Sequence, residues 1–242
     1  MARRAARKSA AKSARSSASG RPTPPAAPLG ERDKIVAAFL ALLAEKPFGE
    51  IGFADIAGRA GVSLTQLRGE FASTLAMLAA HIKATDRAVL AEDLSDMAEE
   101  SPRERLFDVL MRRLEALAPH REALRSLLRS ARRNPPLAVA LNGLAVRSQQ
   151  WMLTAAGINA SGPRGLLRAQ GLAMLFASVL RTWTHDDDPG HARTMAALDR
   201  ALARGQRFAG FLDDLCYIPS RICRLRCRRR HRDEDSEEAA AA

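Results

Sequence analysis

The sequence predicts an all-α protein of about nine helices, arranged as an N-terminal three-helix domain and a larger C-terminal helical domain. Ala, Leu and Arg dominate the composition and favour helix, whereas aromatic residues make up only 5%. Apolar residues recur at spacings of three and four, and no alternating run of any length indicates a strand. With 242 residues, 47% of them hydrophobic, the chain can bury a sizeable core.

The two ends of the chain carry most of its charge. Residues 1–30 hold seven basic residues and no acidic ones among Ala, Ser and Pro, and this composition predicts a disordered basic arm. Residues 218–242 hold seven arginines and five acidic residues and are expected to form a charged tail. Only +2 of the formal net charge of +11 remains for the segment between them. The arms can be solubilising tails or can contact nucleic-acid phosphates without sequence preference.

The first helix is expected to start at Glu31. It places apolar residues on one face and ends before Pro47 and Gly49. The apolar positions of this face are Ile35, Val36, Phe39, Leu42 and Leu43.

A helix-turn-helix is predicted next, with a short helix from Phe53 to Ala60 and a second one that Ser63 caps and that stops at Gly69. Gly61 permits a left-handed backbone at the turn. This geometry leaves one face of residues 63–69 exposed, where it can enter a major groove. A longer helix capped by Ser73 is expected to run to about Leu90 and to join the N-terminal domain, residues 31–78, to the next one.

The C-terminal domain, residues 79–217, should contain the remaining helices. Caps, prolines and glycines delimit them. They are expected at Ser101-Pro102 to about Leu117, Pro119 to about Arg132, Asn134 to about Ala156, Arg164–Trp183 after a loop, and from a cap at Asp186–Pro189 to near Tyr217.

The run F-A-D-I-A-G-R-A-G-V-S over residues 53–63, with Leu67 and Phe71 as anchors and Ser73 opening the next helix, resembles the DNA-binding domain of the TetR family. The resemblance covers about Asp33 to Leu78. It implies a transcriptional regulator, a repressor, that binds the palindromic operator of double-stranded DNA as a homodimer. The DNA-binding residues that it implies are Ser63, Leu64, Thr65, Gln66, Arg68, Ser73 and Thr74.

Each of these side chains has an expected partner on DNA. Gln66 can read adenine and Thr65 can touch a thymine methyl group. Arg68 can reach a base or a phosphate. Ser63, Thr74 and the helix N-terminus at Ser73 can contact phosphates.

The C-terminal half resembles the ubiquinone-biosynthesis lipid-binding proteins, which share the TetR fold. The resembling stretches are Arg105 to Arg125, Trp151, Trp183 to Pro189 and Ala197 to Leu202. This resemblance implies an apolar ligand pocket among the helices, although the same residues can simply be core. The candidate pocket residues are Leu114, Leu128, Leu144, Trp151, Met174, Phe176 and Trp183. An apolar ligand there would release the regulator from DNA by a population shift.

An alternative function is a lipid-binding accessory protein of the same fold with a vestigial helix-turn-helix. Arg68-Gly69-Glu70 stands where the family usually has aromatic or His residues, and Thr74 replaces its usual Lys. Both departures favour the alternative, whereas the basic arms and the Gly61 turn favour the regulator. Small residues in the helix from Arg164 and in the last helix suit either a four-helix dimer interface or internal packing.

Enzymatic chemistry finds little support in the sequence. The histidines are scattered, and neither a Gly-rich phosphate loop nor a nucleophile elbow is present, so we expect no enzyme and no cofactor. Three cysteines, Cys216, Cys223 and Cys227, lack the spacing of a zinc site, and no metal site is expected. No apolar run approaches the ~18 residues of a membrane span, and a cytoplasmic location is expected.

Overall fold

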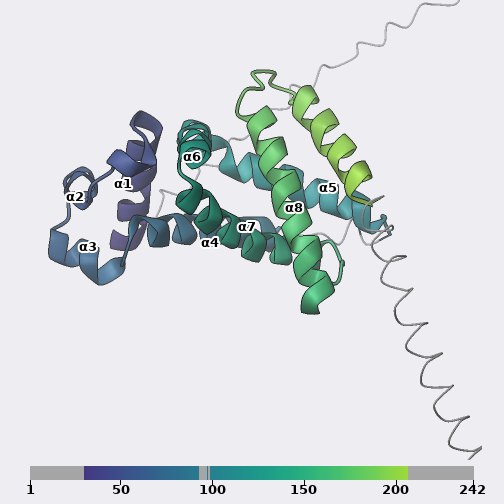
Figure 1. Cartoon of the computed structure of the whole chain (residues 1–242), viewed down its shortest axis with the longest axis horizontal. Helices are drawn as coiled ribbons and strands as arrows, with labels where there is room; N and C mark the ends of the chain where they lie inside the picture. Colours follow the sequence, from purple (N-terminus) through teal and green to yellow (C-terminus); the bar gives the residue numbers. More distant parts are fainter. Residues whose placement is uncertain (1–29, 93–96, 98, 207–242) are drawn as a thin grey trace, which may run out of the picture.

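The computed structural model describes residues 30–92, 97 and 99–206, and every regular element within them is helical (Figure 1). The all-α prediction is therefore confirmed. The elements are α1 (Glu31–Glu45), the 3-10 turn η1 (Phe48–Glu50), α2 (Phe53–Ala60), α3 (Leu64–Glu70), α4 (Thr74–Ala91), α5 (Pro102–Leu117), the 3-10 turn η3 (Ala118–His120), α6 (Arg121–Arg133), α7 (Pro135–Ala155), α8 (Gly162–Trp183) and a further helix over residues 192–206. The expected basic arm, the C-terminal tail and the three cysteines lie outside the described residues.

Side-chain caps set most helix starts where the sequence predicts them. Ser63, Ser73, Ser101 and Asn134 each accept a hydrogen bond from a backbone N–H three residues later. Before the helix over residues 192–206, the carboxylate of Asp188 accepts from the N–H of Ala192 at 3.1 Å. The expected end of this helix near Tyr217 lies outside the described residues.

Two expected helix starts and one expected helix end are displaced by one or two residues. Pro119 lies in the 3-10 turn η3, and α6 begins only at Arg121. Helix α8 begins at Gly162, two residues before Arg164. Helix α3 continues past Gly69 to Glu70, because the N–H of Phe71 still reaches the carbonyl of Leu67 at 2.9 Å. A single glycine weakens a helix without ending it.

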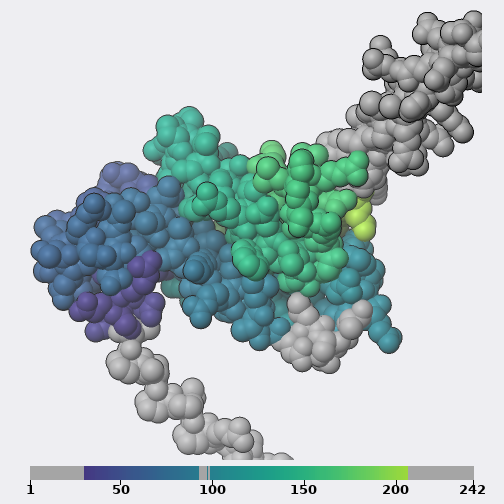
Figure 2. All heavy atoms as spheres, turned by 90° about the horizontal axis from the view of Figure 1, so that it is seen from below, coloured from purple at the N-terminus to yellow at the C-terminus, as the bar shows by residue number. Residues whose placement is uncertain are grey.

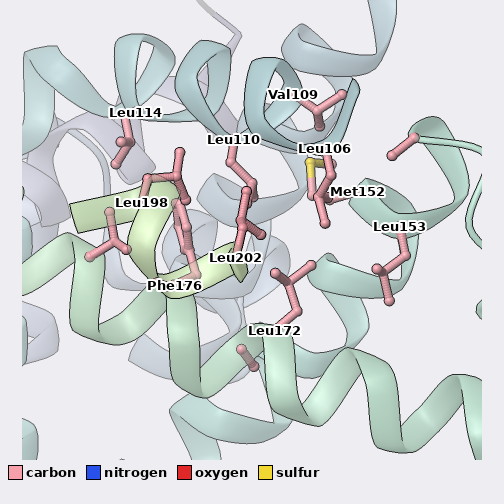
Figure 3. Close-up of a cluster of buried hydrophobic side chains, with 14 of the residues drawn as sticks. Leu106, Val109, Leu110, Leu114, Met152, Leu153, Leu172, Phe176, Leu198 and Leu202 are labelled. Atoms are coloured by element: carbon pink, nitrogen blue, oxygen red, sulfur yellow. The ribbon is translucent and has the colours of Figure 1, made fainter. Parts of the chain in front are cut away.

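Two hydrophobic cores organise the molecule. The first lies among α1–α4 and one face of α6, and Ile35, Phe39, Ile56 and Met77 are fully buried in it. The second lies among α5, α7, α8 and the helix over residues 192–206 (Figure 3). These helices bring Leu110, Met152, Phe176 and Leu198 together from distant parts of the chain (Figure 3).

Helices α4 and α6 contribute to both cores. Met77 of α4 lies in the first core and Val89, three turns later, in the second. Leu127 of α6 lies in the first core and Leu124 in the second. Figure 2 shows the N-terminal segments in purple and blue at one end of an elongated body and the α7–α8 region in green further along it. Helix α6 packs along α1, so the N-terminal half (α1–α4) and the C-terminal half (from α5 onward) share an extensive junction (Figure 1).

A buried ion pair ties α4 to α5 and α7. The guanidinium of Arg113 donates to the carboxylate of Asp86, and the hydroxyl of Ser148 donates to the same carboxylate at 2.8 Å. All three residues are buried. Charges taken out of water require such partners.

Two arginines of α6 hold the C-terminal end of α8. Arg121 donates to the carbonyl of Trp183 at 2.6 Å, and its guanidinium lies over the Trp183 ring, 5.4 Å from the centroid. Arg125 donates to the carbonyl of Thr184 through Nε at 3.1 Å. Cations at a helix C-terminus satisfy its free carbonyls and interact favourably with its dipole.

In the described part of the chain, no helix combines the length and the apolar character needed to span a membrane. Over the same residues, no group of three or more His, Cys, Asp or Glu side chains is arranged to hold a metal ion.

Candidate nucleic-acid interface

Helices α2 and α3 form the predicted helix-turn-helix. Gly61 adopts φ +67° and ψ +34°, the left-handed conformation that the turn requires. Ile56 of α2 and Leu67 of α3 are buried together with Phe71, and Val62 packs against this cluster. These contacts fix the angle between the two helices and turn the other face of α3 outward.

The outward face of α3 carries three exposed side chains, Leu64, Thr65 and Arg68. Leu64 is 56% exposed. The guanidinium of Arg68 has one long contact of 3.5 Å, to the carbonyl of Ala72. These side chains are free to meet a partner.

Gln66 is engaged within the protein. Its Oε1 accepts from the backbone N–H of Ser63 at 2.8 Å and from the Ser63 hydroxyl at 2.9 Å, and its Nε2 donates to Glu31 at 3.1 Å. Ser63 in turn accepts from the N–H of Gln66, so the two residues form a capping box. The spacing of Ser63 and Gln66 is the sequence signature of this motif, and the sequence reasoning missed it.

Glu70 is neutralised by a residue of the first helix. Arg32 on α1 donates to the Glu70 carboxylate at 3.1 Å and to its carbonyl at 2.9 Å. The same guanidinium lies 4.3 Å from the centroid of the Phe71 ring. The contact joins residues 38 positions apart, and no local motif in the sequence points to it.

The start of α4 lies beside this face. Ser73 accepts from the N–H of Ala76 at 3.1 Å, and both Ser73 and Thr74 are half-buried. The first turn of an 18-residue helix presents a positive dipole end, which favours phosphate.

The seven candidate pocket residues are not gathered around one space. Leu114, Phe176 and Trp183 are buried in the second core. Leu128 and Leu144 are half-buried, on α6 and α7. Trp151 and Met174 are 59% and 66% exposed and lie on the surface.

Helices α7 and α8 carry exposed apolar side chains. Leu167 and Met174 lie seven residues apart on α8 and share a helix side, whereas Val139 and Trp151 lie twelve apart on α7 and are turned about 120° from each other. All four are more than half exposed. We call these four residues the α7–α8 face. Between the helices, the side-chain amides of Asn142 and Gln170 bond reciprocally at 2.9 and 3.0 Å.

In its described residues the chain combines a helix-turn-helix, whose outer face is exposed, with a larger helical body. The solved structures that resemble it share this fold. A TetR transcriptional regulator from Nitrosomonas europaea matches with a TM-score of 0.57 and 23% identity, over 73% of this chain and 98% of that one.

Two further structures agree. A TetR-family regulator from Syntrophomonas wolfei matches with a TM-score of 0.53 and 15% identity, over 74% of this chain and 94% of that one. A TetR regulator from a Rhodococcus species matches with a TM-score of 0.51 and 22% identity, over 72% and 95%. No family model and no curated protein matches the sequence. The chain has the fold of the TetR-type regulators.

Proposed function

We propose that this protein is a DNA-binding transcriptional regulator of the TetR family that represses transcription from a palindromic operator. The observation that carries the proposal is the exposed face of α3, held outward by the left-handed Gly61 and by the buried anchors Leu67 and Phe71. The proposal places the protein in the cytoplasm together with its DNA and assigns it no enzymatic step.

In the proposed complex, α3 lies in the major groove. Leu64 and the methyl group of Thr65 suit thymine methyl groups, and Arg68 suits the two acceptors of guanine or a phosphate. Ser63, Ser73 and Thr74 contact phosphates together with the dipole at the start of α4. Gln66 reads adenine only if its amide leaves the capping box, which would give up the bonds to Ser63 and Glu31.

The operator would be palindromic because the protein acts as a homodimer. The α7–α8 face supports this, since four large apolar side chains exposed on two paired helices are expected to be covered by a second copy. A two-fold axis there would place two α3 helices for successive half-sites.

Release from DNA by a small apolar ligand is the third part of the proposal. Helix α6 packs against α1 on one side and holds the end of α8 through Arg121 and Arg125 on the other. A ligand that moves α8 would therefore move the helix that supports α1.

The alternative is a lipid-binding accessory protein with a vestigial helix-turn-helix. The same α7–α8 face favours it, because Trp151 and Met174 could contact an acyl chain instead of a second copy.

Selection of bound fragments from genomic DNA separates the two. The regulator selects specific palindromes, and Arg68→Ala weakens their binding by about 1–3 kcal/mol. Arg132→Gln, an exposed arginine on α6 away from α3, is the matched control and retains the selection. Binding that is sequence-blind and lost with rising salt would refute the regulator and favour the alternative.

Gln66→Ala tests the capping box in the same assay. If the side chain caps α3, the variant lowers stability by about 1 kcal/mol and leaves the selected sequence unchanged. A changed sequence at one operator position would instead assign Gln66 to base readout.

A further inference from the structure

A hollow of about 500 Å³ lies where the two halves of the molecule meet. One wall is the end of α1 and η1, and the other is the last two turns of α6 and the start of α7. Its volume falls in the range of small-molecule sites. The contacts described above do not use it.

Two arginines without partners line this hollow. Arg129 and Arg133 are one helical turn apart on α6, so they share a face, and neither makes an ion pair or hydrogen bond with any described residue. The earlier arginines of the same helix, Arg121 and Arg125, are instead committed to the end of α8. The pair Arg129 and Arg133 is therefore available to a ligand.

Neutral hydrogen-bond donors accompany the two arginines. The Oγ of Ser130 accepts from the N–H of Phe48 at 3.1 Å, which leaves its O–H free to donate. Asn134 uses Oδ1 to cap α7, which leaves the Nδ2 amide group as a donor. Ser126 is not available in this way, because its hydroxyl donates to the carbonyl of Lys46.

The charge balance of the lining is positive. Glu45 also lines the hollow, but Arg59 pairs with it, and Lys46 is paired with Asp55 at 2.7 Å. The remaining charged groups are the two arginines and Glu50. The unpaired charged groups of the lining therefore have a net charge of +1. Guanidinium groups bind paired oxygen acceptors in a planar, bidentate manner.

We propose that this hollow binds a small anionic metabolite through a phosphate or dicarboxylate group. Arg129 and Arg133 hold the oxygen atoms, and Ser130 and Asn134 complete the hydrogen bonds. The site spans η1 and α6, which the Phe48–Ser130 and Ser126–Lys46 hydrogen bonds already connect. A bound anion strengthens that junction. Binding at this site does not depend on the proposed function.

Isothermal titration of the full chain at fixed ionic strength tests the proposal, with inorganic phosphate, succinate and a sugar phosphate as separate probes. At least one probe binds the wild type, and Arg129→Gln and Arg133→Gln each weaken it by about tenfold or more, as expected for lost charge-assisted bonds. Both arginines are exposed, so these variants are expected to fold. The preferred probe distinguishes a phosphate site from a dicarboxylate site.

Arg132→Gln is the control, because it removes the same charge from α6 at an exposed position that does not line the hollow. It retains the wild-type affinity. Absence of binding by all three probes would overturn the proposal. Equal weakening in all three variants would also overturn it, since that result indicates non-specific attraction to the basic chain.

Discussion

His81 on α4 is a buried, uncharged histidine at the junction of the two halves. Its ring meets that of His120 edge to face, with centroids 4.8 Å apart. Burial, followed by the nearby charges of His120 and Arg113, lowers the pKa of His81 from 6.5 to about 4. Burial also lowers the pKa of His120.

The lowered pKa makes stability depend on pH. The unfolded chain takes up a proton on His81 near pH 6.5, whereas the folded chain does so only near pH 4. The stability contribution is therefore complete above pH 6.5 and is lost as the pH falls towards 4. We expect the free energy of unfolding to drop by about 2–3 kcal/mol through this group over that window.

The measurement is denaturant unfolding between pH 7 and pH 4 for the wild type and for His81→Gln. The difference between the two curves isolates His81 from the carboxylates that titrate in the same range. His185→Gln, at an exposed position, serves as the control for the removal of a histidine. Parallel curves for the wild type and His81→Gln would show that His81 is not the group responsible.

Single residues also show where sequence reasoning stops. The left-handed Gly61 and the caps at Ser63 and Ser73 follow from local rules, and the structure confirms them. The engagement of Gln66 was visible in principle, because its spacing from Ser63 is the capping-box pattern. The Arg32–Glu70 pair was not visible, because it depends on how α1 packs against the turn after α3.

At the scale of elements, the Asp86–Arg113 pair joins α4 to α5 inside the molecule. Asp86→Ala leaves a buried guanidinium without its carboxylate, and we expect a loss of about 3–5 kcal/mol in the free energy of unfolding. The double variant Asp86→Leu with Arg113→Met removes both charges, and we expect it to lower the free energy of unfolding by much less. Chemical denaturation of the two variants provides the comparison.

The exposed pair of Arg103 and Asp199 is the matched control for this prediction. Asp199→Asn removes an ion pair of 2.6 Å whose partners are 31% and 57% exposed, and we expect a loss below about 1 kcal/mol. A loss for Asp86→Ala no larger than for Asp199→Asn would contradict the assigned importance of burial.

Within the described residues, element boundaries were predictable to about two residues, for a physical reason. Caps and prolines act locally, so their positions can be read from the chain. The displaced ends at Pro119, Gly162 and Gly69 are places where the last or first turn can tighten or extend at little cost.

At the scale of the whole molecule, the α7–α8 face predicts a dimer. Trp151→Glu with Leu167→Glu places two charges on this face, and we expect a folded monomer where the wild type is dimeric. Sedimentation velocity measures the mass and circular dichroism the helix content. Leu90→Glu, another exposed apolar residue, should remain dimeric. A wild type that sediments as a monomer would refute the proposed interface.

The sequence alone could not establish where the seven candidate pocket residues lie relative to one another in the folded molecule. A sequence pattern identifies apolar positions on a helix, but the side they turn to depends on neighbouring helices. Phe176 and Trp183 turn inward to the second core, whereas Met174, on the same helix, turns outward. Most of the residues that line the hollow at the η1–α6 junction are polar, and they come from segments some 80 positions apart, such as Lys46 and Ser126. No local signal in the sequence connects them.

The division of α4 and α6 between two cores has a practical consequence for dissecting this protein. A fragment cut after α4 would lose Ala123 and Leu127 of α6, which are buried in the first core. The excised fragment would expose an apolar surface to solvent, and we expect it to aggregate before it can be assayed. An experiment on the helix-turn-helix part alone should therefore include α6 or use the full chain.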